Sequence, residues 1–431
     1  MEPVVEIPGA PPTVEPLPIP SPVPTGRPEV HLTPRQWMRQ NLFATPSGSV
    51  LTVVFGVVLA YGAYRLAWFV AISSDWEIIR SNLRLFMIGG RFPVDEAWRL
   101  WGALYILAAL AGLLSGAIVA HAEREARAAG RAVARPGRWD WLRRYWPALA
   151  ALAVILSQTR TWPPTLLTLA GLAILVVTRW LGRRGAWLAR FTWLALLVGV
   201  VAAMQLVSGF GGVGTGDWGG LLLTVYVTVA GIALSFPLGV LVALGRRSSL
   251  PALRGMTVTY IELIRGVPLV ALLFMGHYVV PLLYPNTVEP PAALTRALIA
   301  VTLFESAYIA ETLRGGLQAI PRGQYEAAQA LGLAPWKVTR LIVLPQALRA
   351  VIPAMVGQFI SLFKDTSLLA ILGFFELLEA ARNTTAQPEF LGLRLHTVTF
   401  TFVALIYWAG SYTMSRESRR IEHRLGLGER R

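Results

Sequence analysis

Four polar residues lie inside stretches of sequence that are otherwise apolar. A charged side chain near the centre of a bilayer is costly unless it faces water or a partner, so such residues mark transport paths or acid–base sites. One falls in the middle of the run 293–313, and three fall in the run 351–372. We predict that they line a substrate path across the membrane. These residues are Glu305, Lys364, Asp365 and Ser367.

Two other roles remain open for the same residues. Consecutive side chains on a helix point about 100° apart, so Lys364 and Asp365 do not both face one neighbour fully. One alternative is an ion pair between Lys364 and Glu305 that holds two helices together. The other is an intramembrane enzyme, such as a lipid-modifying transferase, that uses Glu305 or Asp365 as acid or base.

Glu262 and Arg265 form a further charged feature. They are three residues apart, a spacing that brings two side chains onto one face of a helix. They also lie near the end of an apolar run at 257–283. We expect them to pair with each other at the inner mouth of the path rather than to contact a substrate.

A polar stretch at 322–345 separates two long apolar runs. Gln324 to Leu331 contains good helix formers, and Gly332 follows where a C-terminal glycine cap is favoured. Pro335 suits the first position of a second short helix, and Pro345 is expected to end it. The stretch therefore predicts two short helices that project from the membrane for a partner to grip.

The spacing within this stretch resembles the EAA coupling loop of permease subunits in binding-protein-dependent ABC importers. In that family the loop docks into a cleft on a cytoplasmic ATPase and carries its motion into the membrane. Ala327 and Ala328 would let the partner approach closely, and Glu326 would orient it. The residues that carry the resemblance are Glu326, Ala327, Ala328, Gly332, Ile342, Leu344 and Pro345.

Three further segments resemble the polar amino acid branch of the same family, namely YIELIRGVPL at 260–269, AYIAETLRGG at 307–316 and KDTSL at 364–368. The resemblance implies a type I importer (MetI-like) permease core. It also implies three kinds of partner: ATP-binding ABC subunits, a paralogous permease or a second copy of this chain, and an extracytoplasmic amino-acid-binding protein.

Several kinds of chemistry have no motif here. The sequence has no GxxxxGK[ST] phosphate loop, no HExxH and no GxSxG elbow, and its five histidines are scattered. It also contains no cysteine. We therefore expect no catalytic residue, no metal site and no cofactor on this chain, with ATP and magnesium bound by the partner ATPase.

Long apolar runs decide the fold class. Hydrophobic residues make up 55% of the 431 residues, and several runs reach the roughly 20 residues that a spanning helix needs. The sequence predicts an all-α polytopic membrane protein with about ten spans. They are 50–72, 98–120, 146–158, 162–179, 191–208, 219–244, 257–283, 293–313, 351–372 and 397–414.

The distribution of basic residues orients these spans. With a cytoplasmic amino terminus, 28 of the 39 Lys and Arg residues fall on the cytoplasmic side, 7 on the other side and 4 within spans. This bias is typical of a multi-pass protein of the bacterial inner membrane with both termini in the cytoplasm. Because the charges lie between spans, the net charge of +15 indicates a lipid bilayer and not a nucleic-acid partner.

The sequence predicts four regions. A proline-rich region at 1–49 is expected to be a disordered cytoplasmic tail, and a basic cytoplasmic tail follows at 418–431. Five spans at 50–209 form an amino-terminal extension, and the permease core occupies 220–417. The glycine-rich segment between these two regions predicts a flexible linker. A secondary transporter, a third possible class, would show internal repeats, and none is evident.

Overall fold

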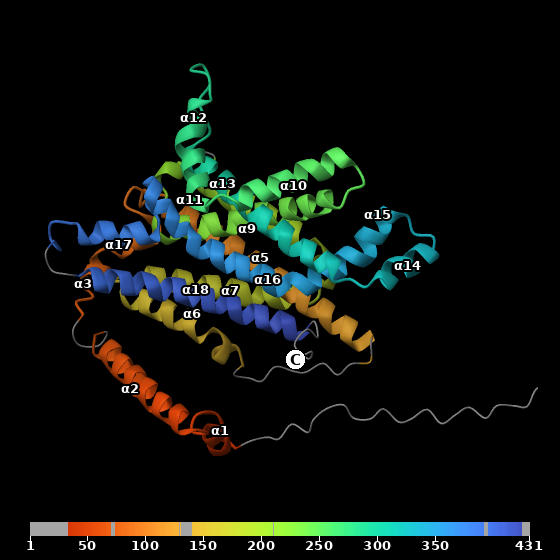
Figure 1. Ribbon diagram of the computed structural model, residues 1–431. Coiled ribbons are helices and arrows are strands. Elements are labelled where there is room, and N and C mark those ends of the chain that lie inside the picture. Colours follow the sequence, from red (N-terminus) through yellow and green to blue (C-terminus); the bar gives the residue numbers. More distant parts are fainter. Residues whose placement is uncertain are drawn as a thin grey trace, which may run out of the picture. The chain divides into compact units, whose positions relative to one another are not determined.

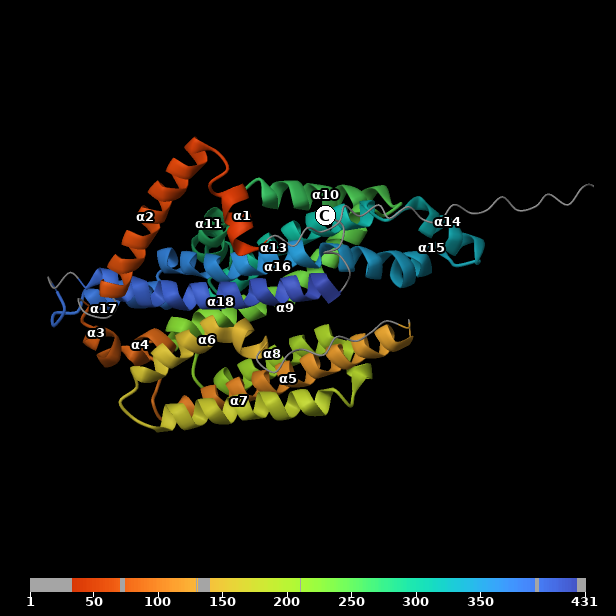
Figure 2. The same cartoon turned by 90° about the horizontal axis from the view of Figure 1, so that it is seen from below.

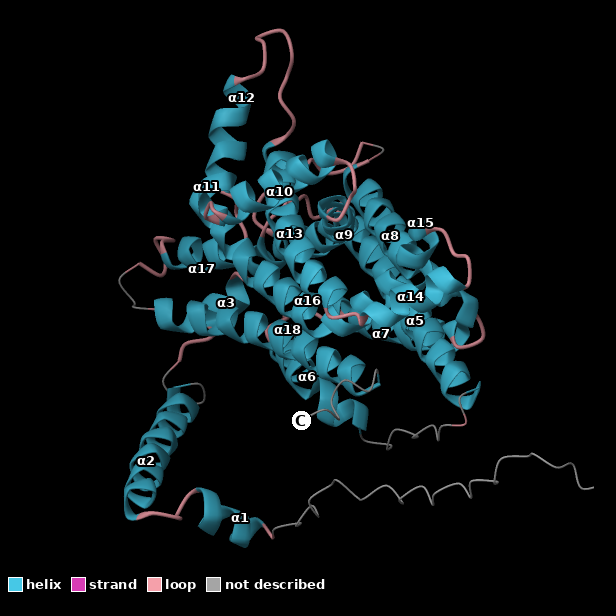
Figure 3. Cartoon of the chain, turned by 45° about the vertical axis from the view of Figure 1, so that its right-hand side comes forward, coloured by secondary structure: helices cyan, strands magenta, loops and turns pink. Residues whose placement is uncertain are grey.

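The computed structural model describes residues 33–69, 74–128, 130, 140–209, 211–391 and 395–424. Most of the proline-rich region and the last seven residues of the basic tail lie outside these ranges. The chain divides into two compact units, with the break between Ser74 and Asp75. The described part of the chain is helical and contains no β-strand, as the sequence predicts (Figure 3).

The first unit contains the helices α1 (Pro34–Asn41) and α2 (Pro46–Trp68). A capping box starts α1, because the Thr33 side chain accepts from the Gln36 backbone N–H while the Gln36 side chain accepts from Thr33. The predicted disordered region is therefore too long at its carboxyl end, since α1 lies inside it. All along α2, apolar side chains are exposed and none is buried, as expected for a helix whose surroundings are lipid or another protein.

The second unit begins with six helices that precede the permease core. Gly112 and Gly116 let α5 approach α7 closely: a Cβ at Gly116 would lie 2.2 Å from the Arg179 carbonyl oxygen. Figure 2 shows α5, α7 and α8 gathered together beside α6. The six helices are α3 (Glu77–Ser81), α4 (Leu83–Ile88), α5 (Ala97–Ala128), α6 (Asp140–Ser157), α7 (Pro163–Gly182) and α8 (Thr192–Ser208).

The remaining helices build the core around α9, α13, α16 and α18, which run alongside one another (Figure 1). Buried residues of α9 and α13, which pack against each other, form the centre of this core. The bounds are α9 (Gly220–Arg246), α10 (Pro251–Arg265), α11 (Leu269–Phe274), α12 (Val280–Leu282), α13 (Ala293–Gln318), α14 (Arg322–Ala330), α15 (Pro335–Lys337), α16 (Leu344–Asp365), α17 (Leu377–Thr385) and α18 (His396–Arg424).

The glycine-rich segment before α9 is packed, contrary to the predicted flexible linker. Trp218 is buried and its indole donates to the Val213 carbonyl oxygen at 3.1 Å. The Gly219 N–H donates to Ile88, and the Gly220 N–H donates to Phe375. A Cβ at Gly220 would lie 2.3 Å from the Phe86 carbonyl oxygen, so these glycines serve close backbone approach rather than flexibility.

Each of the ten predicted spans coincides with a helix or a helix pair. Among the residues that the structure describes, six helices are long and apolar enough to cross a bilayer, and a seventh candidate is a pair that bends by 103°. This pair consists of α10 and the segment Leu269–Leu282, where one continuous span was expected. The helix breaks at Pro268, whose ring cannot continue the hydrogen-bond ladder.

Candidate functional site: a projecting helical hairpin and the charged cluster behind it

The stretch 322–345 folds into a helical hairpin that extends past its neighbouring helices (Figure 1). Gly332 ends α14 in the left-handed region with φ of 75°, as the sequence predicts. The Leu333 N–H returns to the Ala328 carbonyl oxygen, which completes the glycine cap. Pro335 opens the second helix, also as predicted.

Pro345 does not end this second helix. The chain continues from α15 through a π-helix, η5 (Val338–Val343), directly into α16. Pro345 has no N–H to donate, and the wider π turn before it tolerates this missing hydrogen bond. The proline therefore sits at the start of α16 without a break. Movement of the hairpin is therefore connected to a membrane helix without a flexible joint.

The hairpin has an inner and an outer face. Ala328 is buried, in one apolar cluster with Val338 and Val343, so it packs inside the hairpin instead of meeting a partner as predicted. Ile342 and Leu344 are half-buried at the edge of the same cluster. The outer face carries Glu326, Ala327, Gly332 and Pro345 from the predicted set, all exposed.

Large apolar side chains are also exposed on the hairpin. Leu331, Trp336 and Leu341 are 82%, 60% and 58% exposed. Leu331 and Trp336 flank the turn at Gly332 in the chain, and Leu341 follows in η5. An added Cβ at Gly332 would meet no non-neighbouring atom of the described residues within 4 Å. Exposed apolar groups around an open glycine turn form a surface suited to docking. We call Glu326, Ala327, Leu331, Gly332, Trp336 and Leu341 the hairpin tip.

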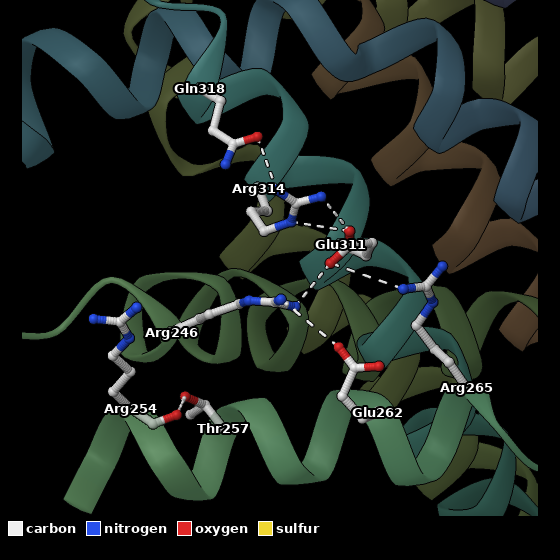
Figure 4. Close-up of polar contacts among 8 residues, drawn as sticks. All are labelled: Arg246, Arg254, Thr257, Glu262, Arg265, Glu311, Arg314 and Gln318. Carbon is white, nitrogen blue, oxygen red and sulfur yellow. Dashed lines mark hydrogen bonds and ion pairs between the residues drawn. The ribbon is translucent and has the colours of Figure 1, made fainter. Parts of the chain in front are cut away.

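Behind the hairpin, at the ends of α9, α10 and α13, lies a cluster of charges centred on Glu311 (Figure 4). Glu311 accepts from Arg314 Nε at 2.9 Å and from Arg246 Nη1 at 3.0 Å. Arg265 Nη1 lies 3.8 Å from the same carboxylate. The Glu311 side chain is 21% exposed. One half-buried carboxylate thus joins three helices through three arginines, a stronger arrangement than a surface pair.

The predicted pair between Glu262 and Arg265 is not formed. Glu262 Oε1 lies 3.7 Å from Arg246 Nη2, whereas Arg265 turns toward Glu311 on α13. The guanidinium of Arg265 also lies 5.4 Å from the ring centroid of Tyr308. In the folded core each of the two residues instead lies within ion-pair distance of an oppositely charged residue on another helix.

A hydrogen bond links the hairpin to this region. Arg247 Nη1 donates to the Tyr325 hydroxyl of α14 at 3.0 Å and to the Leu317 carbonyl oxygen at 3.4 Å. Tyr325 is itself half-buried against the apolar cluster beneath the hairpin. The end of α9 is therefore connected to α14 through Arg247.

Glu305 is the most deeply buried of the predicted path residues. Its side chain is 1% exposed, and its Oε2 atom has no hydrogen-bond partner among the described residues. One turn away, the Thr302 hydroxyl is also buried and without a partner. Asp365 is half-buried at the end of α16, so α13 and α16 each contribute a carboxyl group to the core.

Lys364 does not pair with Glu305. It is exposed, and it forms no ion pair with any residue in the described ranges. Successive side chains on α16 diverge, so Lys364 and Asp365 point in different directions. Ser367 is half-buried in the 3-10 segment η6 (Thr366–Leu372). The structure therefore buries Glu305, half-buries Asp365 and Ser367, and leaves Lys364 exposed.

Sequence reasoning missed the centre of the charged cluster. Glu311 and Arg314 lie in the segment 307–316, whose i, i+3 spacing on an apolar helix was a signal that this pair would form. The role of Arg246 has no such signal, because its partners lie on other helices. No group of three or more His, Asp and Glu side chains within the described ranges is arranged to hold a metal ion.

The fold and these sites define a class of protein: a polytopic membrane permease with a helical hairpin for a partner. Residues 235–426 match the family described as "Binding-protein-dependent transport system inner membrane component". The chain is 35% identical to the inner membrane amino-acid ABC transporter permease protein YhdY of Escherichia coli (strain K12), over 93% of this chain and 96% of that protein.

Of two other comparisons, the first covers most of the chain and the second covers about half of it. The chain is 35% identical to the glutamate/glutamine/aspartate/asparagine transport system permease protein BztC of Rhodobacter capsulatus, over 90% of this chain and 93% of that one. A crystal structure of an amino acid ABC transporter with histidines is 28% identical, covering 47% of this chain and 90% of its own, with a TM-score of 0.42.

The chain therefore belongs to the binding-protein-dependent transport system inner membrane components, and within them to the amino-acid ABC transporter permeases. It is a transport subunit of the inner membrane that works with ATP-binding subunits and a substrate-binding protein. The alternatives of an intramembrane enzyme and of a secondary transporter find no support in these relatives.

Proposed function

We propose that this permease carries polar amino acids into the cell and that its hairpin tip docks into a cleft on the partner ATPase. The observation that supports docking most directly is the tip itself, where Leu331 and Trp336 remain largely exposed outside the apolar core. A soluble loop gains nothing from exposing such side chains, whereas an interface gains stability when they are buried.

The connection from the tip to the membrane supports a role in energy coupling. One continuous helical segment runs from Pro335 to Leu372, and so joins the tip to Asp365. A rigid element of this kind moves both of its ends together, as alternating access requires. ATP binding would close two ATPase subunits, and the hairpins of two permeases would follow them.

Polar amino acids are the proposed substrates for two reasons. Glu305 and Asp365 place two carboxyl groups within a mostly apolar core, and a carboxyl group suits the ammonium group of an amino acid. The relative BztC is named for transport of glutamate, glutamine, aspartate and asparagine. We propose that Glu305, Asp365 and Ser367 line the path, with Lys364 facing a neighbouring subunit.

The remaining assignments follow from the proposed coupling. Both termini and the hairpin lie in the cytoplasm, while the loop between α12 and α13 faces an extracytoplasmic amino-acid-binding protein. ATP and magnesium bind to the ATPase subunits and not to this chain. A paralogous permease or a second copy of this chain completes the path.

Uptake of labelled amino acids into proteoliposomes tests this proposal. The purified complex with its ATPase and binding protein should take up glutamate, glutamine, aspartate or asparagine when ATP is present on the ATPase side. Leucine serves as the apolar control. ATP-driven uptake of leucine alone would refute the proposed substrate class, and uptake without ATP would refute the proposed coupling.

A further inference from the structure

A hollow of about 540 Å³ opens between the end of α9, the beginning of α10 and the end of α13. It lies beside the Glu311 cluster, where Figure 4 shows Arg254 extending from α10 next to Arg246. Four of its six lining residues are arginines and none is a carboxylate. The residues that line this arginine pocket are Arg246, Arg247, Arg254, Val258, Arg314 and Gln318.

The charges around the pocket do not balance. The Glu311 cluster supplies two carboxylates, Glu262 and Glu311, and both are already bound to arginines. Against them stand five guanidinium groups, namely the four of the pocket and that of Arg265. The surplus of three positive charges in and around the hollow favours an anionic ligand.

The arginines also have hydrogen-bond donors to spare. The guanidinium of Arg254 makes no hydrogen bond or ion pair with the described residues, and its side chain is exposed. Arg247 donates to α14 and α13 from Nη1, which leaves its Nε and Nη2 groups for a ligand. Guanidinium groups of this kind bind phosphate oxygens in a bidentate manner.

Apolar side chains next to Arg254 indicate which phosphate compound fits. Leu250 and Leu253 are 62% and 42% exposed at the start of α10. A free phosphate would contact only the arginines. A phospholipid would place its phosphate on the arginines and its acyl chains against this apolar strip, so it matches both features.

We propose that the arginine pocket binds the headgroup of an anionic phospholipid of the cytoplasmic leaflet. This proposal rests on the proposed function for its orientation, because the ends of α9 and α13 face the cytoplasm only if the hairpin does. A lipid in the pocket would contact Arg247, whose guanidinium also donates a hydrogen bond to Tyr325 of α14.

Native mass spectrometry of the purified complex tests the site, with phosphatidylglycerol and phosphatidylcholine as the lipid probes. We expect phosphatidylglycerol to bind more tightly, and Arg254→Gln to weaken that binding about fivefold, the effect of roughly one basic contact near an anionic surface. Arg254→Lys should retain most of the affinity. Arg349→Gln, an exposed arginine of α16 outside the pocket, is the matched control and should change nothing.

Three results would overturn the proposal. Equal binding of the two lipids would exclude recognition of the anionic headgroup. Equal effects of Arg254→Gln and Arg349→Gln would show general charge attraction without a site. Displacement of the lipid by inorganic phosphate at the same concentration would identify a free-phosphate site instead. Lipid binding measured in this way needs no contact between permease and ATPase. A negative result would therefore leave the docking of the hairpin tip untouched.

Discussion

Substitution of Gly332 separates two ways in which the hairpin tip could matter. Its backbone has φ of 75°, a conformation that costs an L-residue with a Cβ about 1–2 kcal/mol. Asparagine tolerates this conformation better than alanine does. No non-neighbouring atom of the described residues lies within 4 Å of a Cβ added here, so the space around the turn is open.

The two variants therefore give different patterns. If backbone strain alone matters, Gly332→Ala should weaken ATPase binding by up to about tenfold, since 1.4 kcal/mol corresponds to a factor of ten, and Gly332→Asn should weaken it less. If the ATPase contacts the turn directly, asparagine should be at least as harmful as alanine because its side chain is larger. We expect the second pattern, since the turn lies among exposed apolar residues.

The assay is the dissociation constant of the ATPase from the purified permease, together with the thermal unfolding temperature of the permease alone. The global unfolding temperature should hardly change, because the turn lies outside the buried core and can relieve the strain by rearranging locally. Gly323→Ala, an open glycine within α14, is the matched control. Wild-type affinity in both Gly332 variants would refute the reasoning.

Three further predictions concern other parts of the chain. Leu331→Ala should weaken ATPase binding by roughly 2 kcal/mol or more without changing thermal unfolding, as expected for an interface anchor; equal affinity would show that Leu331 lies outside the interface. Glu305→Gln should lower uptake at least tenfold while the complex assembles normally, and wild-type uptake would exclude a required charge. Glu311→Gln should lower the unfolding free energy by about 1–3 kcal/mol, because three arginines lose a charged acceptor; Glu379→Gln, in an i, i+3 pair with the exposed Arg382, is its control and should change little.

Local features of the fold could be predicted from the sequence because neighbouring residues determine them. Apolar runs locate the helices, and Gly332 and Pro335 mark the turn of the hairpin. The path of the chain past Pro345 could not be predicted in the same way. There the π-helix η5 accommodates the proline, and this geometry depends on the packing of α14 against η5.

Features that depend on distant residues escaped the sequence. The glycine-rich segment before α9 looks flexible, yet its N–H groups find acceptors at Ile88 and Phe375. Glu262 and Arg265 have the spacing of a local pair, yet the rotation of α10 against α9 and α13 gives each a different partner. For the same reason Lys364 lies exposed and does not pair with Glu305.

Cross-linking from a single cysteine tests the docking of the hairpin tip most directly, because the natural chain contains no cysteine. Ala327→Cys places a thiol on the exposed face of α14, and Val288→Cys places one in the loop before α13, which is 51% exposed. These positions lie at opposite ends of α13, whose 26 residues span about 39 Å. A short thiol-reactive cross-linker should join the ATPase to Cys at 327 and not to Cys at 288. Cross-linking from 288 alone, or from neither position in an intact complex, would contradict the account.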